Sequence, residues 1–103
     1  MIRLHFLIAL FLLAVSAHGQ DMTEVENFGK NSGKLRLFVH IPDSLPDRKV
    51  PMVVVLHGCN QDAHGMMRIS GWNKLADENG FIIAYPEQKG KNNMNRCFNW
   101  FYG

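Results

Sequence analysis

The clearest hydrophobic pattern in this chain is the strict alternation over residues 34–41. Four aliphatic side chains fall on one face of an extended segment and a mixed set falls on the other: Leu35, Leu37, Val39 and Ile41 against Arg36, Phe38 and His40. A period of two residues predicts a half-buried strand. Pro42, which cannot donate to the ladder of a sheet, ends this strand.

Two continuous apolar runs follow, at residues 52–56 and 81–85. Such runs are typical of strands that are covered on both faces, as in a parallel sheet. Between them, a helix is predicted from a capping Ser70 to Asn79, with Gly80 after its end. Three side chains with helical spacing form the face expected in the core: Trp72, Leu75 and Ala76. Strand, helix and strand make a βαβ unit, in which a right-handed crossover joins two parallel strands.

Polar segments that contain glycine or asparagine separate these elements and are predicted to be loops: residues 21–33, 43–49, 57–65 and 87–103. Two of these loops directly follow the strands of the βαβ unit, one starting at His57 and the other at Glu87. In open α/β sheets, ligands bind beyond the carboxyl ends of the strands. Both loops are therefore expected to open at the same edge of the sheet, which makes that edge the candidate site.

The first twenty residues have the pattern of a secretory signal. Arg3 supplies the positive charge, residues 6–15 form an unbroken apolar run, and the small residues Ala17 and Gly19 suit a cleavage site. This run is too short to span about 30 Å of hydrocarbon. Residues 1–19 are therefore interpreted as a signal peptide, and residues 20–103 as a secreted chain with no stable membrane association.

Export changes the interpretation of the two cysteines, Cys59 and Cys97. Outside the cytoplasm, two cysteines favour a disulfide over a metal or redox pair, with two independent buried thiols as the alternative. A zinc cluster of His57, Cys59, Asp62 and His64 has suitable ligand types, but its spacing matches no closed site. A disulfide would also consume the Cys59 thiol, so no metal site is predicted.

Composition and charge narrow the function classes further. The 103 residues are 47% hydrophobic and 19% charged, which is typical of a globular domain and excludes a disordered tail. The net charge of +2 is too weak and too evenly spread for a nucleic-acid surface, so no nucleic-acid partner is expected. This length fits one small domain at most, which excludes a multidomain enzyme.

Four short motifs occur in order along the mature chain. They are HGC at residues 57–59, GWNKLAD at 71–77, YPEQ at 85–88 and NRCFNW at 95–100. This series is similar to the secreted poly(3-hydroxybutyrate) depolymerase family, which includes related feruloyl and acetylxylan esterases. The resemblance covers residues 34–101. It implies an α/β-hydrolase fold, with a mostly parallel sheet and flanking helices, of which residues 20–103 are the incomplete N-terminal portion.

The resemblance also implies a chemistry. The family hydrolyses carboxylic esters, on polyesters or as feruloyl and acetyl esters of polysaccharides, through a Ser-His-Asp triad and an acyl-enzyme, without a cofactor. The serine lies in a G-x-S-x-G motif, which these 103 residues lack. All three triad members are therefore expected beyond Gly103, and the chain by itself is expected to be inactive. By chain order His57 is not the catalytic base but supports its loop.

The resemblance assigns an oxyanion contribution to this chain. The backbone N–H of Cys59 would stabilise the developing alkoxide of an ester carbonyl, and His57 and Gly58 would support its loop. Because the cysteine of the family's HGC motif can be disulfide-bonded, Cys97 is its implied partner here. Two further residues are candidates for substrate binding: Asn60 and Trp100.

Two other function classes stay open at this point. A small exported binding module would hold polymer or carbohydrate on the aromatic run at residues 100–102, without catalysis. An exported zinc-binding protein would use the histidine and cysteine cluster instead. The sequence leaves the ester specificity and the oligomeric state open.

Overall fold

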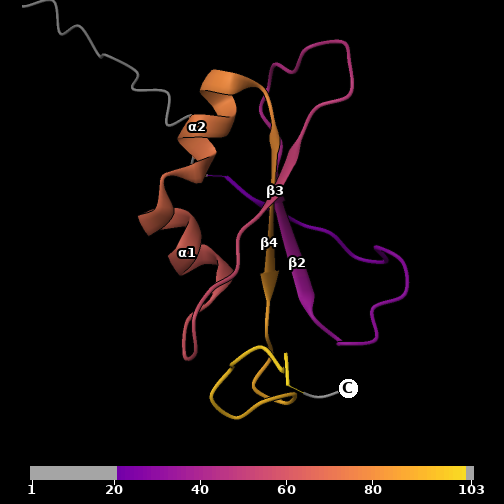
Figure 1. Cartoon of the computed structure of the whole chain (residues 1–103), viewed down its shortest axis with the longest axis vertical. Coiled ribbons are helices and arrows are strands. Elements are labelled where there is room, and N and C mark those ends of the chain that lie inside the picture. Colours follow the sequence, from indigo (N-terminus) through magenta and orange to yellow (C-terminus); the bar gives the residue numbers. More distant parts are fainter. Residues whose placement is uncertain (1–20, 102–103) are drawn as a thin grey trace, which may run out of the picture.

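The computed structural model describes residues 21–101, which form one sheet with two helices packed against it (Figure 1). The elements in chain order are β1 (Thr23–Glu24), β2 (Arg36–His40), β3 (Met52–Val54), α1 (Ala63–Ser70), α2 (Trp72–Asn79) and β4 (Ile82–Glu87). The strand order is β1-β2-β4-β3, so β1 and β3 are the edge strands. The predicted signal peptide, residues 1–19, lies outside the described residues.

The βαβ unit predicted from the two apolar runs is confirmed. Strands β3 and β4 pair in parallel, with Val53 opposite Ile83, and both helices lie in the connection between them. The prediction of a mostly parallel sheet is wrong for the described residues, because β4 pairs antiparallel with β2 and β2 pairs antiparallel with β1. Hydrophobic alternation predicts which residues share a face and not which way a strand runs, so a mixed sheet fits the same pattern.

The crossover contains two helices where the sequence predicted one. Helix α1 was missed because its first turn, with His64 and Gly65, has the composition of a loop. The structure supplies a cap instead, since Oδ1 of Asp62 accepts a hydrogen bond from the N–H of Gly65 at 2.7 Å. Gly71 has a φ of 74° and joins the two helices, because it is the C-cap of α1 and the N-cap of α2. Helix α2 therefore begins at Trp72, two residues after the predicted cap.

Strand β4 continues through Pro86, which was expected to end it. The carbonyl of Ala84 accepts from the N–H of Val55 at 2.8 Å, so the backbone groups of residue 84 face β3. Backbone groups alternate sides along a strand, which makes those of Pro86 face β3 as well. Because β3 ends at Val54, no ladder bond is lost at Pro86.

Both helices cover the same face of the sheet (Figure 1). The core lies between them and the sheet, and its buried hydrophobic members are Phe38, Val55, Ala63, Met67, Ala76, Ile83 and Tyr85. In β2 it is thus the face with Phe38 and His40 that is buried. Of the helix face predicted for the core, Ala76 is fully buried and Trp72 packs against the cluster, whereas Leu75 is exposed.

The opposite face of the sheet is apolar and uncovered by helix within residues 21–101. Met52 and Val54 of β3 are 62% and 58% exposed, so the prediction that this strand is covered on both faces is wrong for the described chain. Their neighbours across the ladder are Ile82 and Ala84, which share that face. Ile41 and Leu56 add further exposed aliphatic surface.

Two polar clusters, one around His40 and one around Arg36, join β2 to neighbouring parts of the chain. His40, which is buried, lies 2.7 Å from Oδ1 of Asp77 in α2 and 2.8 Å from the carbonyl of Asp21. Arg36 binds the carboxylate of Glu24 through two nitrogens, at 2.8 and 2.9 Å. These hydrogen bonds hold the pKa of Glu24 below its usual value and raise that of Arg36.

The hydroxyl of Tyr85 gives a test of the core. This side chain is fully buried, and its Oη donates to Oδ1 of Asn73 at 2.7 Å, while burial raises the pKa of Tyr85. Tyr85→Phe keeps the ring but leaves Oδ1 of Asn73 buried without its donor. The free energy of unfolding is expected to fall by about 1–3 kcal/mol in urea denaturation. An unchanged midpoint, matching that of an Asn79→Ala control at the exposed end of α2, would contradict this.

Candidate functional site

The loop that follows β3, residues 57–62, lies at the edge of the sheet where the sequence places the candidate site. It runs from the end of the ladder with β4 to the N-terminus of α1. The loop that follows β4 lies beside it, because the N–H of Gln88 donates to Nε2 of His57 at 3.0 Å. The prediction that the two loops open at one edge of the sheet is therefore confirmed.

His57 connects these two loops and is only 4% exposed. Its Nδ1 lies 2.7 Å from the carbonyl of Gly58, and its Nε2 faces the N–H of Gln88. Because an N–H group only donates, Nε2 must accept and Nδ1 carries the proton, which is the neutral ring. The ring also packs on Phe98, with centroids 4.8 Å apart. Both ring nitrogens of His57 therefore have partners within the two loops.

The 57–62 loop is also held at its centre. Cys59 and Cys97 form a disulfide, the pairing that the sequence favoured. The N–H of Asn60 donates to the carbonyl of Asn95 at 2.7 Å, and Asn60 has a φ of 58°. This left-handed backbone is one that asparagine tolerates better than most residues. A covalent bond and a short hydrogen bond therefore join the loop to residues 95–97.

Three of the six backbone amides of this loop, those of His57, Cys59 and Asp62, have no acceptor among the described residues. The N–H of Gly58 donates to Oε1 of Gln61, that of Asn60 to Asn95, and that of Gln61 to the carbonyl of Gly58. Within residues 21–101 the N–H of Cys59, in the middle of this run, has no hydrogen-bond partner. Of the three residues, only Cys59 is exposed, since His57 is buried and Asp62 is intermediate.

A network of amide side chains organises residues 88–99, which we call the 88–99 loop. Gln88 is 3% exposed and bonds through its side chain to the carbonyl of Cys97 and to Nδ2 of Asn92. Asn93 accepts from the N–H of Cys97 and donates to Asn99. The disulfide is thus attached to an ordered loop, although this segment has no regular secondary structure.

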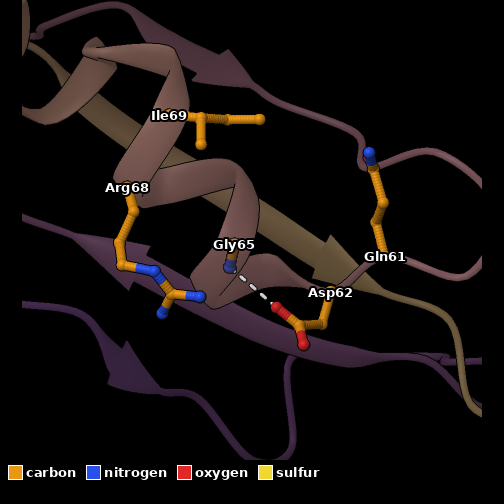
Figure 2. A pocket seen from close by; sticks show the side chains of 5 residues that line it. All are labelled: Gln61, Asp62, Gly65, Arg68 and Ile69. Carbon is orange, nitrogen blue, oxygen red and sulfur yellow. Dashed lines mark hydrogen bonds between the residues drawn. The ribbon is translucent and has the colours of Figure 1, made fainter.

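An open pocket of about 200 Å³ lies beside the 57–62 loop. Figure 2 shows the residues that line it, which come from the loop and from α1: Gln61, Asp62, Gly65, Arg68 and Ile69. The sequence did not predict this pocket, because one wall is helix α1, which the composition of residues 63–70 does not indicate.

The other predicted site residues are not brought together. Asn60 lies in the 57–62 loop and is exposed. Trp100 is 88% exposed, and its ring lies edge-on to that of Phe101 at 5.6 Å. No hydrogen bond or ring contact joins Trp100 to residues 57–60 in the part of the chain that the structure describes.

Neither a metal cluster nor a membrane-spanning helix occurs among the described residues. Residues 21–101 contain no group of three or more histidine, cysteine or acidic side chains placed to hold a metal ion. Cys59, which would be a ligand in the zinc alternative, has its sulfur in the disulfide with Cys97. Among the same residues, no helix is long and apolar enough to cross a membrane.

The family model described as Esterase PHB depolymerase matches residues 35–103, which include the whole site. The chain belongs to this family. It is 45% identical over 91 residues to "Poly(3-hydroxyalkanoate) depolymerase C" of Paucimonas lemoignei, an alignment that covers 87% of this chain and 22% of that protein. It is 32% identical to "Feruloyl esterase B" of Thermothelomyces thermophilus, over 84% of this chain and 28% of the relative.

A solved structure agrees with this esterase family. The acetyl xylan esterase from Aspergillus awamori superposes with a TM-score of 0.59 at 27% identity, over 64% of this chain and 24% of that one. The family resemblance is therefore confirmed. It spans about a quarter of the length of the curated relatives it matches.

Proposed function

We propose that this chain supplies one half of the oxyanion hole of a secreted serine esterase. The observation that carries the proposal is that the N–H of Cys59, at an exposed residue, has no acceptor within the described residues. It lies beyond the carboxyl end of β3, and the disulfide holds its residue in place. A rigid, unpaired N–H is what stabilises the negative oxygen that forms when an ester carbonyl is attacked.

The reaction proposed is ester hydrolysis through an acyl-enzyme, without a cofactor. A serine would attack the carbonyl carbon, and the carbonyl oxygen would become an alkoxide facing the N–H of Cys59. No G-x-S-x-G motif occurs in the 103 residues, so the serine, with its aspartate and histidine, would come from elsewhere in a longer enzyme. A second donor would then be the N–H after that serine.

The uncovered apolar face of the sheet supports the proposal that this chain is part of a larger domain. Met52, Val54 and Leu56 are each more than half exposed there, next to the paired residue Ile82. Contiguous apolar surface of this kind marks a region that another element covers. We therefore propose that residues 20–103 form the N-terminal portion of an α/β-hydrolase domain, and that later helices cover this face.

The compartment and substrate follow from the same proposal. Residues 1–19 would be removed as a signal peptide, and the disulfide between Cys59 and Cys97 suits an oxidising, extracellular environment. The substrate would be a polyester or an ester-substituted plant polysaccharide, since the relatives are named as a poly(3-hydroxyalkanoate) depolymerase, feruloyl esterases and probable acetylxylan esterases. Asn60, next to the proposed donor, and the exposed Trp100 would contact that polymer.

Hydrolysis of p-nitrophenyl acetate tests the proposal in two steps. The 103-residue chain is expected to show only background hydrolysis, because it lacks the nucleophile. A chimera in which residues 20–103 replace the matched segment of depolymerase C is expected to hydrolyse the ester and to be blocked by a serine-directed inhibitor. Inhibitor-sensitive turnover by the chain alone, or a folded but inactive chimera, would refute the proposal.

A further inference from the structure

Two polar residues at the end of β4, Glu87 and Gln88, are buried although each carries several hydrogen-bonding atoms. Glu87 is 9% exposed and Gln88 is 3% exposed. Burying such groups costs free energy unless they are hydrogen-bonded. Their hydrogen-bond partners therefore indicate what these two residues do. Those partners include residues at the beginning and just after the end of the 57–62 loop.

Gln88 holds the beginning of the 57–62 loop. Its backbone N–H donates to Nε2 of His57 at 3.0 Å, a bond that fixes the neutral ring. Its side-chain Nε2 donates to the carbonyl of Cys97 at 3.1 Å, and its Oε1 accepts from Nδ2 of Asn92 at 2.8 Å. The side chain therefore restrains the cysteine to which Cys59 is covalently joined.

Glu87 holds the end of the same loop. Its Oε1 accepts from the N–H of Ala63 at 3.0 Å, in a buried bond to the first residue of α1. Its Oε2 accepts from Nη1 of Arg36 at 3.1 Å, which keeps the carboxylate in place from the side of β2. Glu87 and Gln88, at the end of β4, thus restrain both ends of the 57–62 loop, which follows the neighbouring strand β3.

We propose that Glu87 and Gln88 are positioning residues for the backbone N–H of Cys59. The inference rests on the proposed function, since it takes that N–H as the oxyanion donor. An irregular loop otherwise retains conformational freedom, and a misplaced donor loses most of its effect on the transition state. Neither residue faces the reacting atoms; both act through His57, Ala63 and Cys97.

Amide hydrogen exchange on the ¹⁵N-labelled 103-residue chain tests this directly. Gln88→Met keeps the length of the side chain and removes its hydrogen bonds. The exchange of the Asn60 amide, which bonds to Asn95, is expected to accelerate about tenfold. The core amide of Val55, which bonds to Ala84, is expected to exchange at the wild-type rate. The ring ¹⁵N signals of His57 are expected to keep their neutral form, because the N–H that donates to Nε2 belongs to the backbone of residue 88 and is retained.

Glu87 is tested by a conservative pair of variants. Glu87→Met is expected to accelerate exchange of the Ala63 amide about tenfold, whereas Glu87→Gln keeps the accepting oxygen and is expected to restore the wild-type rate. The matched control is Asn79→Ala, which removes an amide side chain that bonds to the carbonyl of Leu75, away from the loop. It is expected to change none of the loop amides.

Two results would overturn the inference. One is equal acceleration of the Asn60 and Val55 amides, which would mean that Gln88 stabilises the fold as a whole. The other is no acceleration at Asn60. Should Gln88→Met fail to fold, Gln88→Glu replaces it, because it retains Oε1 for Asn92 and puts an oxygen that cannot donate when ionised in place of the amide that bonds to Cys97. No ester is hydrolysed in these measurements, so their failure is distinguishable from failure of the proposed esterase function.

Discussion

Replacing Cys59 by proline in the depolymerase C chimera is expected to lower kcat by roughly 10²–10³ with little change in KM. Proline has no N–H, so the substitution removes the proposed oxyanion donor itself. The donor acts mainly on the alkoxide that forms in the reaction and only weakly on the bound ester. Its loss therefore reduces the rate of the chemical step more than the binding of substrate.

The matched control for that variant is Cys59→Ser in the same chimera. Serine keeps the N–H and, like proline, removes the disulfide, so the ratio of the two kcat values isolates the donor from the covalent bond. Steady-state kinetics on p-nitrophenyl acetate would measure both. Equal kcat values for the proline and serine variants would show that the N–H of Cys59 contributes nothing to the reaction.

Removal of the disulfide is expected to have the largest effect on stability. The bonded cysteines are 38 residues apart, and in the chain-entropy model closing a loop of this length stabilises the folded state by about 4 kcal/mol. That is close to the whole net stability of many small domains. The double variant Cys59→Ser/Cys97→Ser is therefore expected to be largely unfolded or to lose most of its resistance to urea.

Urea denaturation followed by circular dichroism checks this expectation. The wild-type chain is measured with and without dithiothreitol, and its reduced form is expected to match the double variant. The double variant itself is the control for the reductant, because it has no disulfide to lose and is expected to behave identically in both conditions. A midpoint shared by the oxidised wild type and the double variant would contradict the expectation.

Much of the fold was predictable because its strands carry strong local patterns. The alternation over residues 34–41 and the apolar runs around Val53 and Ile83 place β2, β3 and β4 within a few residues. The meeting of the two loops also followed from the sequence, since parallel neighbours bring their carboxyl ends to one edge. The HGC motif then pointed to Cys59.

The features that the sequence did not predict depend on tertiary context. Helix α1 has a weak intrinsic preference and is stabilised by the Asp62 cap and by burial of Met67. The direction of β2 has no signature in an alternating pattern. The exposure of Met52 depends on what covers the sheet rather than on its own strand. Likewise, the roles of Glu87 and Gln88 become visible only when their partners, far apart in the chain, are known.

Strand β3 has a consequence for handling the protein. It is short and pairs on one side with β4, so within the described chain its other side presents unpaired N–H and C=O groups. An open strand edge beside exposed Met52 and Val54 is a template for pairing with another polypeptide. We therefore expect self-association through this edge to compete with native folding as the protein concentration rises, so dilute samples favour material in which the proposed oxyanion donor can be studied.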